Sequence, residues 1–64
     1  MIVKTIDTNG YEVCFNAMLF ESLSVIEAGS DVLLTEITLT TGSKILSTET
    51  ILQICDKILK AIEW

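Results

Sequence analysis

The stretch Ile-Leu-Gln-Ile-Cys-Asp-Lys-Ile-Leu-Lys-Ala-Ile at residues 51–62 decides the fold class of this 64-residue chain. Its apolar residues recur at i, i+3, i+4, i+7 and i+11, the spacing of one face of an α-helix. The residues on this face are Ile51, Ile54, Cys55, Ile58 and Ile62, and Leu52 and Leu59 widen it. We expect an amphipathic helix that buries the face. A two-stranded coiled coil is the weaker interpretation, because the segment spans barely two heptads.

The residues just before this stretch have the character of a helix N-terminus. Ser47 or Thr48 is expected to accept hydrogen bonds from the free amides of the first turn, and Glu49 complements the helix dipole. Asp56 and Lys60 are spaced for an exposed i,i+4 ion pair. The expected helix therefore begins close to Glu49.

The first 15 residues have the pattern of a β-hairpin. Residues 1–7 are rich in β-branched side chains and precede Asn9-Gly10, the pair best suited to the two positive φ values of a type I′ turn. The return strand over residues 11–15 alternates with period two, with Tyr11, Val13 and Phe15 on one face and Glu12 and Cys14 on the other. Cys14 is interpreted as a small residue packed on that second face.

Three more strands are expected before the helix. Asn16 to Phe20 interrupts the alternation and predicts a helical turn or corner. Strands follow over residues 22–28, 32–40 and 44–47, with turns at Gly29-Ser30-Asp31 and Thr41-Gly42. On the long strand one face carries Leu33, Thr35, Ile37 and Leu39. Because threonine tolerates positive φ badly, a type I turn with Gly42 in the left-handed region is favoured over a type I′ turn.

These elements predict the α+β class, in one domain over residues 1–64. The expected architecture is a small antiparallel sheet of four to five strands, built from hairpins, with one C-terminal amphipathic helix packed on it. A domain of this size removes only about 60% of its unfolded surface from water, and its stability is marginal. Half of the residues are apolar, so we expect hydrophobic surface to remain uncovered and to be hidden by self-association or by a protein partner.

Composition argues against several functional classes. The chain has no histidine, arginine or proline, and its four lysines and nine carboxylates give a net charge of −5. We therefore expect no enzyme, no cofactor, no metal and no nucleic-acid partner, because general bases, phosphate-binding forks and basic stripes are missing. No apolar run approaches the about 20 residues of a bilayer span, so no membrane insertion is expected. Without a secretory h-region, a cytoplasmic location and free Cys14 and Cys55 are favoured.

The motifs that suggest chemistry have simpler interpretations. Thr41-Gly42-Ser43-Lys44 lies between two strands and is expected to be a hairpin turn, since a P-loop connects a strand to a helix. Asp31 is expected to be a turn residue, since no calcium-binding loop surrounds it. Glutamates 12, 21, 27 and 36 lie on separate elements, and serines 22, 24, 30 and 47 have no base to activate them.

Large apolar and aromatic residues are the candidate interface positions, because such side chains dominate binding hot spots. Trp64 either folds back on the domain or anchors another chain, and Met18, Leu19 and Phe20 form either a core corner or a contact patch. The interface candidates are Trp64, Ile62, Leu59, Leu52, Phe20, Met18 and Tyr11.

The order of these signals resembles the small flagellar and swarming-motility FlbD family, which includes SwrD-like proteins. The matching segments are Asn9-Gly10, Asn16-Ala17, the run from Thr35 to Gly42, and Glu49-Thr50 before Ile51-Leu52. Two features depart from the family pattern: Leu33-Leu34-Thr35 replaces Pro-Asp-Thr, and the stretch between Asn16 and Thr35 is roughly six residues longer, which extends a hairpin at little cost. The resemblance implies a cytoplasmic accessory protein of flagellar motility that contacts other proteins.

Three functions follow as hypotheses. The leading one is a non-enzymatic protein-interaction module, motility-associated if the resemblance holds, that uses the helix edge, Trp64 and an exposed strand. The second is an acidic inhibitor, encoded by a phage or mobile element, that occupies a nucleic-acid groove on a host defence or regulatory protein. The third is an oligomer that binds a small ligand in a pocket lined by threonine and serine hydroxyls at a subunit boundary.

Overall fold

Five strands and two helical segments make up the computed structural model, which describes residues 1–63. In chain order they are β1 (Ile2–Ile6), β2 (Glu12–Asn16), the 3-10 helix η1 (Ala17–Leu19), β3 (Phe20–Glu27), β4 (Leu33–Leu39), β5 (Lys44–Ser47) and α1 (Ile51–Ile62). All strand pairs are antiparallel. The predicted α+β class with one C-terminal helix is therefore confirmed, as is the helical turn after Asn16.

The five strands divide into two sheets. One has the order β1-β2 and the other has the order β3-β4-β5, which leaves β3 at an edge. A single bridge between Asp7 and Ser47 joins the sheets, next to the hydrogen bond that the Thr48 amide donates to the Ile6 carbonyl over 3.0 Å. The chain between β2 and β3 passes through η1, whose first amide donates to the Met1 carbonyl. The two sheets are thus bonded to each other at the C-terminal end of β1, and η1 is bonded to its N-terminal end.

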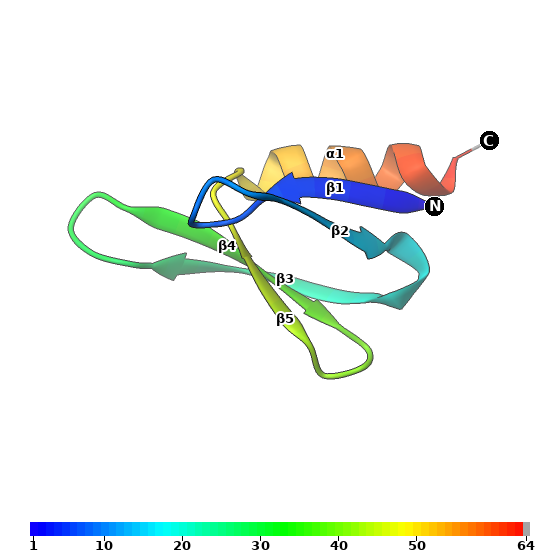
Figure 1. The fold of residues 1–64 in the computed structure, drawn as a ribbon, viewed down its shortest axis with the longest axis horizontal. Coiled ribbons are helices and arrows are strands. Elements are labelled where there is room, and N and C mark those ends of the chain that lie inside the picture. Colours follow the sequence, from blue (N-terminus) through cyan, green and yellow to red (C-terminus); the bar gives the residue numbers. More distant parts are fainter. Residues whose placement is uncertain (64) are drawn as a thin grey trace.

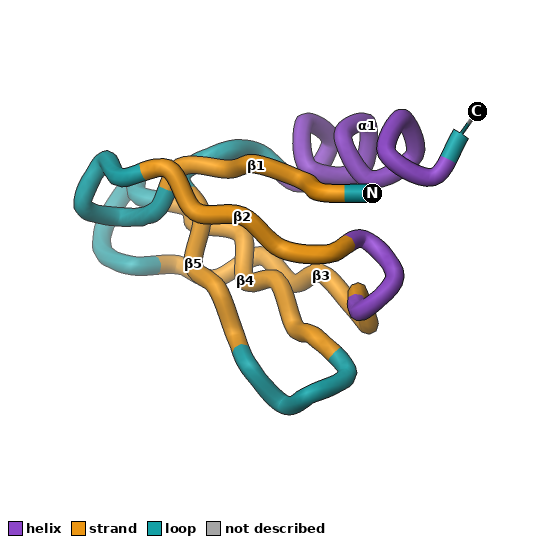
Figure 2. Tube along the Cα trace, turned by 45° about the vertical axis from the view of Figure 1, so that its right-hand side comes forward, coloured by secondary structure: helices purple, strands orange, loops and turns teal. Residues whose placement is uncertain are grey.

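The helix lies in the same layer as the β1-β2 sheet. Figures 1 and 2 both show α1 running beside β1, with the three-stranded sheet on the other side of the core. Side chains from both layers meet between them, and the buried apolar residues are Val3, Phe15, Ala17, Ile37, Leu39, Ile54 and Ile58. The β3-β4 hairpin extends past this core and makes the molecule elongated, 39 × 21 × 19 Å (Figure 1). The end of this hairpin lies outside the two-layer core (Figure 1).

The turn after β4 follows its predicted geometry. Leu39 and Ser43 form the last bonded pair, with the Leu39 amide donating to the Ser43 carbonyl over 2.9 Å, and the Gly42 amide donates to the Leu39 carbonyl over 2.9 Å. Gly42 has φ +90°. A left-handed glycine after a type I turn was the predicted arrangement, and it is confirmed.

The turn between β1 and β2 uses the same scheme, so the predicted type I′ turn is wrong. The Asp7 amide donates to the Tyr11 carbonyl, the Gly10 amide donates to the Asp7 carbonyl, and only Gly10 of the Asn9-Gly10 pair has a positive φ. The Asp7 carboxylate accepts hydrogen bonds from the amides of Asn9 and Tyr11, each over 2.9 Å. These bonds stabilise the observed loop because one carboxylate satisfies two of its backbone amides.

The helix begins at Ile51, two residues later than a cap at Thr48 would place it. Thr50 is the N-cap: its hydroxyl accepts from the Gln53 amide over 3.2 Å, and the Gln53 side chain accepts from the Thr50 amide over 2.8 Å. This is a capping box. Ser47 and Thr48 were the wrong candidates, because the Ser47 hydroxyl accepts from the amide of Glu49, which precedes the helix, and the Thr48 hydroxyl donates to the Ile6 carbonyl of β1.

Candidate interaction surface

Only half of the apolar stripe on α1 reaches the core. Ile54 is fully buried and Ile58 nearly so, with Ile51 and Ala61 half-buried beside them. The other half is exposed: the exposed fractions are 78% for Leu52, 55% for Leu59 and 40% for Ile62. Cys55 is exposed on the same side. The prediction that the helix buries the whole stripe is therefore wrong for this second row.

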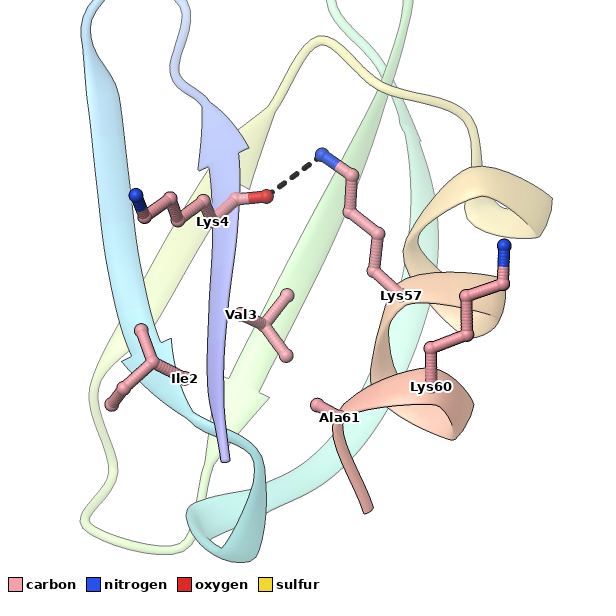
Figure 3. Close-up of a pocket in the computed structure, with 6 residues that line it drawn as sticks. All are labelled: Ile2, Val3, Lys4, Lys57, Lys60 and Ala61. Carbon is pink, nitrogen blue, oxygen red and sulfur yellow. Dashed lines mark hydrogen bonds between the residues drawn. The ribbon is translucent and has the colours of Figure 1, made fainter. Parts of the chain in front are cut away.

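The exposed row faces away from β1. The opposite flank of the helix carries Lys57, whose Nζ donates to the Lys4 carbonyl oxygen of β1 over 2.8 Å. Figure 3 shows this contact, with the Lys4 side chain on the other side of β1. At 100° per residue, Leu59 lies about 160° from Lys57 around the helix axis. Because β1 occupies one flank, the second apolar row is left on the flank that has no strand beside it.

The β3-β4 hairpin continues the exposed row beyond the start of the helix. Val25 of β3 and Leu33 of β4 are exposed, although their register partners Thr35 and Glu27 place both on the sheet face that carries the buried Ile37. Together with Leu52 they line a groove of about 250 Å³ between the hairpin and the start of α1. We call the exposed set the α1–β3 surface; it comprises Leu52, Cys55, Leu59, Ile62, Val25 and Leu33.

Acidic residues surround this surface. Glu21 and Glu27 lie near the two ends of β3, Asp31 lies in the hairpin turn, and Asp56 and Glu63 lie next to the exposed row on α1. Lys4 and Lys57 lie on the β1 side of the helix, and Lys44 pairs with Glu36 on the outer face of the three-stranded sheet. Lys60 pairs with Asp56, so Glu21, Glu27, Asp31 and Glu63 carry the negative charge of the rim. The rim of the α1–β3 surface is therefore negatively charged.

A buried polar cluster lies at the other flank of the helix and has a structural role. The Glu49 carboxylate accepts from Lys57 Nζ over 2.8 Å and from the Thr5 hydroxyl over 2.6 Å, and Thr5 also bonds to the hydroxyl of Ser47. Thr35 donates to the Glu49 carbonyl. The cluster fixes the chain before α1 to strands of both sheets.

The ionisation of Glu49 follows from these contacts. Burial is the largest influence and favours the neutral carboxyl group, but the hydrogen bonds from Lys57 and Thr5 and the charge of Lys57 together lower the pKa of Glu49 below its ordinary value of 4.5. Glu49 is therefore held as a carboxylate and does not serve as a proton donor near neutral pH. Ser47 is fully buried and out of reach of a substrate.

The cavity beside β1 is lined in part by Lys57 and Lys60, whose ammonium groups already have partners. It measures about 390 Å³ and is lined by Ile2, Val3, Lys4, Lys57, Lys60 and Ala61 (Figure 3). Lys57 Nζ is bound by Glu49 and the Lys4 carbonyl, and Lys60 Nζ lies 3.0 Å from a carboxylate oxygen of Asp56. An anionic ligand would have to displace these contacts. The α1–β3 surface is the better candidate site.

The structure brings together some of the sequence-predicted interface residues. Leu52, Leu59 and Ile62 share one row. Tyr11, just before β2, and Met18, in η1 after β2, are exposed at separate places. Phe20 is half-buried and packs against the core. Trp64 lies outside the described residues. Val25, Leu33 and Cys55 were not among the predicted interface residues, because strand alternation or helical spacing indicated an inward face for each of them.

Cys14 also differs from its prediction. It is exposed on β2 and is a free thiol, like Cys55, so it does not pack on a second covered face. Among residues 1–63 no cluster of three or more histidine, cysteine or acidic side chains has the arrangement of a metal site. Over the same residues, no helix is both long and apolar enough to cross a membrane. The chain matches no family model, no curated protein and no solved structure at a significant level.

Proposed function

We propose that this protein is a non-enzymatic interaction module that binds another protein chain through the α1–β3 surface. The observation that carries the proposal is the second apolar row on α1, where Leu52 and Leu59 are mostly exposed on a helix whose other row is buried. Contiguous exposed apolar rows with a polar rim are typical of interaction sites. The rim of carboxylates gives this surface the usual anatomy of an apolar centre inside a charged border.

The chemistry of the remaining surface supports a binding role over a catalytic one. The lowered pKa of Glu49 stabilises its charged form, and its carboxylate is already bonded to Lys57 and Thr5. A general acid or base needs a pKa close to the working pH and access to a substrate. The resemblance to the FlbD and SwrD-like family supports an accessory role in motility inside the cytoplasm.

The test compares capture of partner proteins from the source cell by three forms of the chain. The Leu52→Gln/Leu59→Gln double variant keeps side-chain size and removes the apolar row, and Leu46→Gln is the matched control on the outer face of the three-stranded sheet. A partner bound by the parent and the control but lost by the double variant would support the proposal. Equal capture by all three forms would contradict it.

Self-association is measured on the same proteins. Sedimentation across a concentration range shows whether the parent forms dimers and whether the double variant abolishes them. Loss of dimers only in the double variant would identify a second copy as the bound chain. A parent that stays monomeric and captures no protein would contradict an interaction role through this surface.

A further inference from the structure

The free edge of β3 adds a second recognition element beside the apolar row. β3 has β4 as its one neighbour in the sheet, and its eight residues form the longest strand of residues 1–63. Near the turn, the Ala28 amide donates to the Val32 carbonyl over 2.9 Å. Because bonded pairs alternate along an antiparallel ladder, Ser22, Ser24 and Ile26 are bonded to β4.

The backbone groups of the intervening residues therefore point away from β4. These are Leu23, Val25 and Glu27, whose amides and carbonyls face the open side of the sheet. Edge strands are usually protected by lysine, proline or an inward charge. In β3 such features are confined to the two ends, where the register shifts between Phe20 and Ser22 and where Glu27 lies on the inward face; the segment between them, from Ser22 to Ile26, has no charge and no proline. This edge is a template for one more strand.

A strand added there would lie against the exposed row of α1. The side chains of Leu23 and Val25 are on the sheet face that the helix covers, and Val25 shares its groove with Leu52. Alternate side chains of the new strand would point to the same side. The added segment needs apolar residues at those positions, because they would be covered by Leu52 and Leu59.

The acidic rim decides the charge of the segment. Glu21 and Glu27 mark the ends of the β3 edge, and Asp31 lies just beyond it in the turn. Pairing of β3 with β3 of a second copy would bring these carboxylates of both chains together, with a net charge of −5 on each chain. Like charges at such a junction oppose association. A segment with Lys or Arg at its ends complements the same rim.

Building on the proposed function, we propose that β3 is the docking edge for an extended segment of a different protein, with apolar residues at alternate central positions and Lys or Arg at both ends. Backbone hydrogen bonds along the edge provide affinity, the α1–β3 surface accepts the apolar side chains, and the rim selects the charge.

The probe is the peptide Lys-Lys-Val-Thr-Val-Thr-Val-Lys-Lys, with a control in which Glu replaces every Lys. Titration followed by amide NMR and hydrogen exchange should show binding of the basic peptide, slower exchange at Leu23 and Val25, and weakening by salt. The acidic peptide should bind at least about tenfold more weakly than the basic peptide. Equal binding of the two peptides, protection confined to another element, or no binding of the basic peptide would overturn the inference.

Two variants make the assignment sharper. Val25→Pro removes an amide that faces the open edge and leaves the bonds to β4 intact, so the fold should persist while peptide affinity falls about tenfold. Glu21→Lys/Glu27→Lys should reverse the preference between the two peptides. This double variant still tests the inference if the proline variant does not fold. An unchanged preference would refute the role of the rim.

The inference and the proposed function can fail separately. If a captured partner is lost with Leu52→Gln/Leu59→Gln but retained by Val25→Pro, the surface binds a protein without strand addition, and only the inference is wrong. If concentrated protein without peptide doubles its mass and protects Leu23 and Val25, the occupant is a second copy, which also overturns the inference. If neither variant affects capture, the proposed function itself fails.

Discussion

Ile54 and Leu52 both belong to the apolar stripe of α1, but substitution of each by alanine is expected to have a very different effect on the free energy of unfolding. Ile54 is fully buried among the core residues, so Ile54→Ala removes buried methyl groups and leaves a cavity, at a cost of about 2–5 kcal/mol. Leu52 is 78% exposed. Since fully burying a leucine contributes about 1.5–3 kcal/mol, the buried fifth of Leu52 contributes roughly 0.3–0.7 kcal/mol.

Alanine has a higher helix propensity than leucine, which offsets part of this small loss at Leu52. The assay is urea unfolding followed by far-UV circular dichroism. In a domain this small Ile54→Ala can exceed the total stability, so Ile54→Val is measured as well; it should cost about 0.5–1.5 kcal/mol, and each kcal/mol lowers Tm by about 4–8 °C. Leu59→Ala, at a position that is 55% exposed, should cost roughly twice as much as Leu52→Ala and less than Ile54→Ala.

Measurement at a low and a high protein concentration separates folding from association, because binding of a second copy stabilises the folded chain in a concentration-dependent way. If Leu52→Ala at low concentration destabilises the protein as much as Ile54→Ala, the second apolar row is packed within the chain, and the reasoning that leads to the α1–β3 surface is refuted.

Three further predictions concern local features. Thr50→Ala should lower the free energy of unfolding by about 1 kcal/mol through loss of the capping box, whereas Thr48→Ala should have the smaller effect in the same denaturation assay; the reverse order would contradict the assigned N-cap. Folding lowers the pKa of Glu49, so the contribution of its carboxylate to stability is present above the unfolded pKa of about 4.5 and is lost as pH falls through the lower folded value. Glu49→Gln should therefore flatten the dependence of stability on acid pH, measured by circular dichroism. An unchanged pH profile would contradict the role assigned to Glu49. Gly42→Ala should cost about 1 kcal/mol or more because φ is +90° there, whereas Ser43→Ala in the same turn should be nearly neutral; equal Tm values for the two variants would argue against the left-handed glycine.

Local sequence determined the elements of this protein. The strands, the corner after Asn16 and the α1 stripe follow from residues that are neighbours in the chain, since side-chain alternation and helical spacing act over a few positions. The turn at Gly42 was predictable for the same reason. The turn at Gly10 was not, because the Asp7 side chain competed for its amides. The N-cap was predicted at the wrong residue because Ser47 belongs to β5 and the Thr48 hydroxyl is bonded to the Ile6 carbonyl of β1.

Tertiary structure decided which apolar residues are covered. Helical spacing gives the angle between Leu52 and Ile54 around the helix axis, but it does not predict which side of the helix packs against another element. The helix packs with Ile54 and Ile58 in the core and Lys57 against β1, and this orientation leaves Leu52 and Leu59 without cover. The sequence therefore predicted three residues of the exposed row as interface positions: Leu52, Leu59 and Ile62. That Val25 and Leu33 belong to the same surface depends on the packing of α1 beside β1 and on the edge position of β3.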